Sequence, residues 1–239
     1  MLSEAEARNA VITALDCGRD EALALADTLS GHAGWVKVGM TLSYACGPEI
    51  VSEMHRRGLK VFLDLKLHDI PHQIRGAAEA ASRAGADILS VHALGGAEMV
   101  KAAREGVEAA AKDRDERTKI IAISVLTSMD QATLASIGVA DSVANEVARL
   151  AKLAYGAGAD GMVCSPQEAH ELRELLGPDA LVVTPGVRPA GSAVGDQKRI
   201  ATPASAIASG ASKLVVGRPI TQAEDPAAAF EAIVSELCA

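Results

Sequence analysis

The chain has 239 residues, of which 49 % are hydrophobic and only 2 % aromatic, and its formal net charge at pH 7 is −8. This length suits one large α/β barrel. An apolar fraction made mainly of Ala, Val, Leu and Ile favours helices packed over branched strands rather than an aromatic-rich β sandwich. The negative charge argues against a general nucleic-acid or anionic-membrane surface, because both need a basic face, but it still allows one locally positive pocket for a small anion.

The N-terminal residues MLSEAEARNA are acidic and polar, without the cationic start and apolar stretch of a signal peptide. No window approaches the roughly 18 uninterrupted apolar residues of a membrane span. We therefore expect a cytoplasmic protein. Its cysteines lack C-x-x-C spacing, so they indicate neither a zinc site nor a disulfide framework; they are Cys17, Cys46, Cys164 and Cys238.

Eight apolar runs rich in β-branched residues recur along the chain, with helical patterns between them. The runs are AVITAL (10–15), WVKVG (35–39), KVFLDL (60–65), DILSVHA (87–93), KIIAISVL (119–126), GMVCS (161–165), ALVVTPG (180–186) and KLVVG (213–217). Each run with its following helical stretch has roughly the length of a βα unit. Several helical stretches end in a glycine, a common stop signal: Gly31, Gly58, Gly85, Gly158, Gly177 and Gly210. The pattern predicts a single (β/α)8 barrel domain over residues 1–239.

In such a barrel the functional residues gather at the C-terminal ends of the strands. Charged and hydrogen-bonding residues cluster in or just after these strand ends, which comprise Asp16, Lys37, Asp64, Lys66, His92, Thr127, Ser165, Pro185 to Arg188, Gly217 and Arg218. One long irregular insertion, RPAGSAVGDQKR (188–199), separates the seventh strand from a helix expected to begin near Pro203. A loop of that length in a compact domain is usually functional or disordered.

The stretch DLKLHDIP (64–71) concentrates three charges after an apolar run. Asp64 and Lys66 stand two apart on a strand, so their side chains are expected on the same face, with Asp69 on the turn above. A lysine between two carboxylates is held protonated. Such a lysine suits stabilising a carbanion and then donating a proton to it, whereas Schiff-base chemistry needs the neutral amine. The alternative is a structural ion-pair cluster at a strand end.

A second constellation suits a phosphate group. LVVGRPI places Gly217 at a strand end and Arg218 at the start of the final helix, where backbone N–H groups, the helix dipole and a guanidinium converge. Arg188 and Gln197 from the long insertion add two further donors. Strands seven and eight are a known phosphate location in such barrels.

With these motifs the chain resembles the orotidine 5'-phosphate decarboxylase family over essentially its whole length. The D-x-K-x-x-D element alone is shared with sugar-phosphate relatives, whereas HDIP together with GDQKR and VVGRPI is far more specific. The matching segments are ALD (14–16), VKVG (36–39), DLKLHDIP (64–71), SVHALGG (90–96), LTS (126–128), TPGVRP (184–189), GDQKR (195–199), TPASAI (202–207) and VVGRPI (215–220).

The resemblance implies a lyase that decarboxylates orotidine 5'-phosphate to UMP, the final step of de novo pyrimidine biosynthesis, without a metal or organic cofactor. It implies that Lys66 donates the proton within an alternating network of Lys37, Asp64, Lys66 and Asp69. It also implies a homodimer with shared active sites, in which Asp69 serves the partner's site. No nucleic acid or membrane partner is implied.

The remaining roles also follow from the resemblance. Asp16 and Lys37 would hold ribose hydroxyls, and Thr127 would lie near the pyrimidine. Phosphate contacts would come from Arg188, Gln197, Gly217 and Arg218, and further substrate contacts from Asp64, Ile70, Gln73 and Pro185.

One departure concerns the residues after HDIP, where the family commonly has Asn-Thr and this chain has His72-Gln73. The amide of Gln73 could replace the threonine hydroxyl on a ribose hydroxyl. Two alternatives stay open: a Mg²⁺-dependent sugar-phosphate decarboxylase or aldolase of the same superfamily, and a noncatalytic nucleotide-phosphate binding barrel. His68, His72 and His92 lack the spacing of a metal motif.

Overall fold

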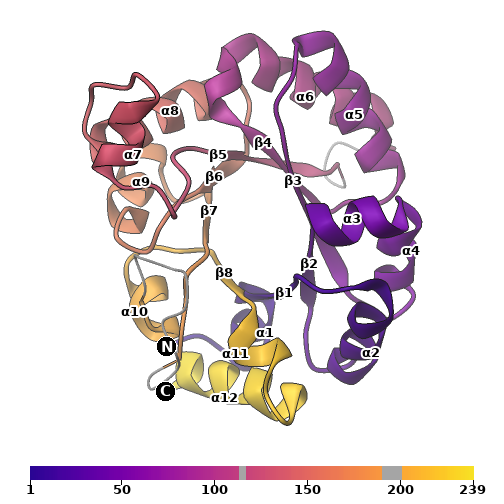
Figure 1. Ribbon diagram of the computed structural model, residues 1–239. Coiled ribbons are helices and arrows are strands. Elements are labelled where there is room, and N and C mark those ends of the chain that lie inside the picture. Colours follow the sequence, from indigo (N-terminus) through magenta and orange to yellow (C-terminus); the bar gives the residue numbers. More distant parts are fainter. Residues whose placement is uncertain (113–116, 190–200) are drawn as a thin grey trace.

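Eight parallel strands form a closed barrel in which each strand pairs with its neighbours in the sequence (Figure 1). The computed structural model describes residues 1–112, 117–189 and 201–239. The strands are β1 (Val11–Leu15), β2 (Trp35–Gly39), β3 (Lys60–Leu67), β4 (Ile88–His92), β5 (Lys119–Ile123), β6 (Gly161–Val163), β7 (Leu181–Thr184) and β8 (Lys213–Val216). The predicted (β/α)8 barrel is confirmed. The predicted runs 119–126 and 161–165 extend past the strands, because their last residues already form the loops at the rim.

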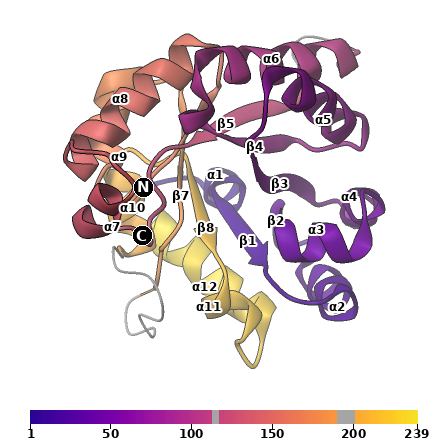
Figure 2. The ribbon, with the colours of Figure 1, turned by 45° about the horizontal axis from the view of Figure 1, so that its top comes forward.

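Helices surround the barrel on its outer side (Figures 1 and 2). Besides the short 3-10 helix η1 (Ala93–Gly95), they are α1 (Glu4–Ala10), α2 (Arg19–Leu29), α3 (Met40–Cys46), α4 (Glu49–His55), α5 (Pro71–Arg83), α6 (Gly96–Ala110), α7 (Gln131–Ser136), α8 (Val143–Gly156), α9 (Ala169–Leu176), α10 (Pro203–Ala208), α11 (Arg218–Thr221) and α12 (Pro226–Cys238). The six glycines predicted to end helices all have positive φ. None of the helices in the described ranges is long and apolar enough to span a bilayer.

The helix α1 was not predicted, although its start carries a capping signal. The Ser3 hydroxyl accepts a hydrogen bond from the Glu6 amide, and the Glu6 carboxylate accepts one from the Ser3 amide. This reciprocal pair satisfies amides that would otherwise lack partners at the helix start. The two termini lie side by side, because the Leu2 amide donates to the carbonyl of Leu237 on α12 (Figure 2).

The hydrophobic core has two parts. Alternate strand residues fill the inside of the barrel, and the others pack between strands and helices. The inner cluster contains Ile12, Ala14, Trp35, Phe62, Ile88, Ile121, Val183 and Val215. Because this cluster fills the middle of the barrel, it separates the two mouths from each other.

Strand β3 departs from regular pairing just where the charged motif begins. Its register against β4 shifts between Leu63 and Leu67, and Lys66 has φ 51°, the one positive φ of a non-glycine among the described residues. Such a backbone costs on the order of 1 kcal/mol or more and needs support from its surroundings. The Lys66 amide finds that support in the Ser90 hydroxyl, to which it donates at 2.8 Å. The regular alternation assumed from the sequence therefore does not hold at Lys66, and the bulge directs its side chain.

Candidate active site

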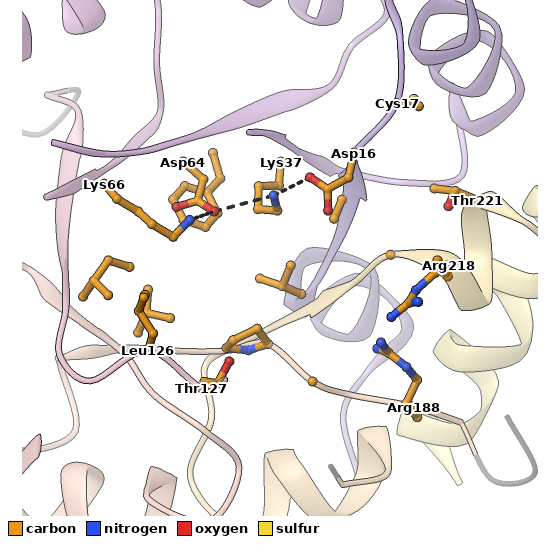
Figure 3. Close-up of a pocket in the computed structure, with 18 of the residues that line it drawn as sticks. Asp16, Cys17, Lys37, Asp64, Lys66, Leu126, Thr127, Arg188, Arg218 and Thr221 are labelled. Atoms are coloured by element: carbon orange, nitrogen blue, oxygen red, sulfur yellow. Dashed lines mark hydrogen bonds and ion pairs between the residues drawn. The ribbon is translucent and has the colours of Figure 1, made fainter. Parts of the chain in front are cut away.

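A cavity of about 500 Å³ opens at the C-terminal ends of the strands (Figure 3). Nine of the residues predicted from the sequence line it: Asp16, Lys37, Asp64, Lys66, Thr127, Pro185, Arg188, Gly217 and Arg218. They come from the ends of β1, β2, β3, β5, β7 and β8, which only the closed barrel brings together.

Four of these side chains form a row of alternating charge (Figure 3). The Lys66 ammonium donates to Asp64 Oδ2 at 2.7 Å, and the Lys37 ammonium lies 3.5 Å from the same oxygen. Lys37 also donates to Asp16 Oδ1 at 2.8 Å. Both ammonium groups therefore reach into the cavity with their positions fixed by carboxylates.

Asp64 is the most constrained carboxylate of the row. Burial opposes its ionisation, but the adjacent Lys37 and Lys66 and the hydroxyl of Ser90 outweigh burial and hold the pKa of Asp64 below its usual value. Ser90 is fully buried on β4 and donates to Asp64 Oδ1 at 2.8 Å. One hydroxyl thus positions both the Asp64 carboxylate and the Lys66 backbone, a role that the sequence reasoning missed.

Arg188 and Arg218 stand across the cavity from the charge row, with their guanidinium groups directed toward one another (Figure 3). Arg188 is 9 % exposed, and its amide donates to the Ala201 carbonyl at 2.9 Å. Two converging guanidinium groups suit a phosphate dianion, because each presents a fork of donors.

One detail of the predicted phosphate site needs correction. Arg218 does not open the final helix: it begins the four-residue helix α11, and α12 follows it. The N-terminus of so short a helix contributes little dipole, so the charge available to an anion comes chiefly from the guanidinium groups.

An apolar floor lies between the two charged sides. Phe62 and Val215 form it from inside the barrel, together with Ile123, Val125 and Val163. This combination of an apolar floor with few convergent polar groups is typical of a small-molecule site.

Four polar residues that line the cavity were not predicted: Cys17, Glu21, Thr221 and Gln222. Cys17 and Glu21 follow Asp16 closely in the sequence, and Thr221 and Gln222 follow Arg218. This closeness in the sequence is the signal that could have identified them. Burial, followed by the charges of Glu21 and Asp16, raises the pKa of the Cys17 thiol to about 11. The thiol is therefore protonated at neutral pH and is a poor nucleophile.

The other predicted residues do not line this cavity. Asp69, Ile70 and Gln73 lie exposed around the turn from β3 into α5. Gln197 and most of the insertion 188–199 lie outside the described residues, which omit 190–200.

The two further rim residues, His92 and Ser165, also lie outside the lining of the cavity. The ring of His92 stacks on His68, with centroids 5.2 Å apart. Burial, the neighbouring His68 and Lys66 lower the pKa of His92, which favours its neutral form. Within the described ranges no three His, Cys, Asp or Glu side chains are grouped to hold a metal ion.

Comparison with known proteins identifies the family. A model of the orotidine 5'-phosphate decarboxylase / HUMPS family matches residues 9–233. The chain belongs to this family. Orotidine 5'-phosphate decarboxylase of Halorhodospira halophila is 54 % identical over 90 % of both chains, and that of Geotalea daltonii is 48 % identical over 98 % of both. The crystal structure of orotidine 5'-phosphate decarboxylase from Lactobacillus acidophilus superposes with a TM-score of 0.86 at 40 % identity, covering 96 % of this chain and 99 % of that one.

Proposed function

We propose that the protein decarboxylates orotidine 5'-phosphate to UMP, as the final step of de novo pyrimidine biosynthesis. The observation that carries the proposal is the placement of the Asp16–Lys37–Asp64–Lys66 row opposite two converging arginines, across one apolar-floored cavity. Family membership and relatives named for this activity over nearly their full length support it.

The chemistry starts with the pyrimidine C6 next to the Lys66 ammonium. The bond between C6 and the carboxylate breaks, carbon dioxide leaves, and the electron pair stays on C6 in the ring plane. The fixed ammonium stabilises that charge as it develops and then gives its proton to C6, which yields UMP and a neutral amine that water reprotonates. Because the row is assembled before substrate enters, little reorganisation is needed during the reaction.

The remaining groups bind the nonreacting parts of the substrate. Arg188 and Arg218 hold the phosphate with Gly217 and Gln197, and Asp16 and Lys37 hold the ribose hydroxyls. Thr127 and Pro185 contact the pyrimidine side. Binding energy from the phosphate end is thereby available to stabilise the transition state at C6.

Each site is completed by the partner in a homodimer. Asp69, Ile70 and Gln73 lie exposed outside their own cavity, and the large apolar side chain of Ile70 is 63 % exposed. In the dimer this turn reaches the partner's cavity, where Asp69 extends the charge row and the Gln73 amide contacts a ribose hydroxyl. The enzyme is cytoplasmic, acts as one domain over residues 1–239, and needs no cofactor.

The test is turnover of orotidine 5'-phosphate by the purified protein, followed as loss of the ultraviolet absorbance of the substrate. We expect full activity in the presence of a chelator and none in Lys66→Ala, whose fold is checked by circular dichroism. A matched control, Lys152→Ala, removes an exposed lysine of α8 and should leave the rate unchanged.

The alternatives predict different results. A magnesium-dependent sugar-phosphate enzyme would lose activity to the chelator, and a noncatalytic barrel would bind the nucleotide without turnover. Near wild-type kcat in Lys66→Ala would contradict the proposed proton donor.

A further inference from the structure

A second cavity, of about 910 Å³, opens at the opposite end of the barrel, where the strands begin. Among the described residues, its lining carries six cationic side chains and a single carboxylate, that of Asp87: the cations are Lys60, Arg83, Lys112, Arg117, Lys119 and Lys213. The protein as a whole has a net charge of −8, whereas the described residues that line this mouth are mainly cationic. The proposed decarboxylation uses none of these residues.

Three of the lysines are directed by the strands themselves. Lys60, Lys119 and Lys213 are the first residues of β3, β5 and β8. Each stands two positions before a residue of the inner barrel cluster, so strand alternation directs its side chain to the barrel axis. Lys60 and Lys213 both lie over the ring of Trp35, with their ammonium nitrogens 5.5 and 4.2 Å from its centroid.

The positive charge at this mouth is not neutralised by the described residues. Arg83 is paired with Glu79 and Arg117 with Asp160, whereas Lys60, Lys119 and Lys213 make no ion pair with a carboxylate in the described ranges. Asp87 is itself engaged by the ring of His55 at 3.0 Å and the Val61 amide at 2.7 Å.

Lys213 is the least exposed of the three lysines, at 6 %. Its ammonium donates to the Asn9 carbonyl at 2.6 Å and to Asn9 Oδ1 at 3.4 Å, and it lies over the Trp35 ring. Burial, with a further contribution from Lys60, lowers the pKa of Lys213 to about 8. Holding a buried cation beside other cations is unfavourable, and an anion among them would relieve that cost.

We propose that the N-terminal mouth of the barrel is a binding site for a small polyphosphate anion, held by Lys60, Lys119 and Lys213 above the Trp35 ring. The point charges of lysine suit a compact, multiply charged group without demanding one orientation. The cavity is large enough for such an ion with its bridging waters. This inference is independent of the decarboxylase reaction, because the packed inner cluster separates the two mouths.

The experiment titrates inorganic triphosphate into the full chain by calorimetry at pH 7 and fixed ionic strength. It uses an Arg188→Ala/Arg218→Ala background, so that the other cavity does not contribute. We expect one site per chain, which Lys60→Gln/Lys119→Gln weakens about tenfold, because the double substitution removes two of the three ammonium groups that hold the anion. Both substituted lysines are at least partly exposed, so folding is not at risk. A matched control, Lys101→Gln/Lys152→Gln, removes the same charge from α6 and α8 and should leave the affinity unchanged.

A second measurement guards against general charge effects. Triphosphate should raise the melting temperature of the background protein more than that of Lys60→Gln/Lys119→Gln, because a ligand that binds only the folded state stabilises it. Citrate at matched charge tests the phosphate assignment, and equal affinity for citrate would overturn it. The site itself would be refuted by undetectable binding in the background, or by equal losses in the test and control pairs.

Discussion

The single hydroxyl of Ser90 positions two groups of the active site. It donates to Asp64 and accepts from the Lys66 amide, so it links the carboxylate that orients the lysine to the strained backbone that carries it. Removing it leaves a buried carboxylate oxygen and a strained amide without this partner. A loss of that kind acts through Asp64 and Lys66, which makes Ser90 a positioning residue.

We predict that Ser90→Ala lowers kcat about ten- to a hundredfold with little change in KM, because the ammonium is misplaced in the transition state more than in the bound substrate. Ser90→Thr, which retains the hydroxyl, should restore most of the rate. Steady-state kinetics of both variants provide the check. An unchanged kcat in Ser90→Ala would show that Lys66 holds its position without this hydroxyl.

Arg218 is predicted to act through the phosphate alone. Arg218→Ala should reduce kcat/KM for orotidine 5'-phosphate by about a hundredfold, as expected when one charge-assisted contact to a desolvated phosphate is lost. The nucleoside orotidine, which has no phosphate, should be processed at the same low rate by both proteins. Arg56→Ala, which removes an exposed arginine just after α4, serves as the control. An equal loss with orotidine would mean that Arg218 supports the fold or the reacting end instead.

At the scale of the element, the two ends of β3, β5 and β8 differ in chemistry. The cavity at the C-terminal ends is lined by both acids and bases, whereas the starts of these three strands carry lysines. Lys213 at the start of β8 shows the energetic consequence. Its pKa is about 8 in the folded protein, against an ordinary value of 10.5. Between these values the unfolded chain binds more protons than the folded chain, so this group makes stability rise with pH.

We therefore predict that Lys213→Met removes a stability gain that the wild type acquires between pH 8 and pH 10.5. The difference between the two free energies of unfolding should change by about 3 kcal/mol across that window, with the wild type gaining at high pH. Urea unfolding at several pH values measures it, and Lys152→Met on α8 provides the control. Parallel curves for wild type and Lys213→Met would contradict the lowered pKa.

At the scale of the whole molecule, the charged residues of the motif DLKLHDIP lie in two different places. Asp64 and Lys66 line the cavity of their own chain, while Asp69 lies on the exposed turn beyond it. Two other exposed apolar side chains follow the neighbouring strand β2, Met40 at 45 % and Tyr44 at 82 %. The proposed dimer would cover these apolar side chains.

We predict that two inactive variants, Lys66→Ala and Asp69→Ala, regain activity when their subunits are exchanged. In a mixed dimer both substitutions fall in one site, and the other site is wholly wild type. With random exchange about half of the dimers are mixed, so about a quarter of all sites recover. Decarboxylation is measured before and after the two proteins are dissociated and reassembled together. No gain despite verified exchange would place Asp69 in the site of its own chain.

Local patterns in the sequence were enough to predict the barrel. Branched apolar runs and the helical spacing between them are properties of residues close together in the sequence. These patterns identified all eight strands. The rule that function gathers at the C-terminal strand ends then located nine lining residues. The hydrophobic pattern does not predict α1, even though Ser3 and Glu6 form a capping pair, because its seven residues are too few to show helical periodicity.

Only the tertiary structure decided how those residues meet. Closing the barrel brings the Ser90 hydroxyl of β4 within hydrogen-bond distance of the Lys66 amide, and it turns Arg188 toward Arg218. It also gathers lysines from β3, β5 and β8 at the opposite mouth. Such contacts depend on strand register, and a single bulge changes the direction of a side chain. No local pattern in the sequence encodes that bulge, because it arises from pairing between β3 and β4 and from the hydroxyl that supports it.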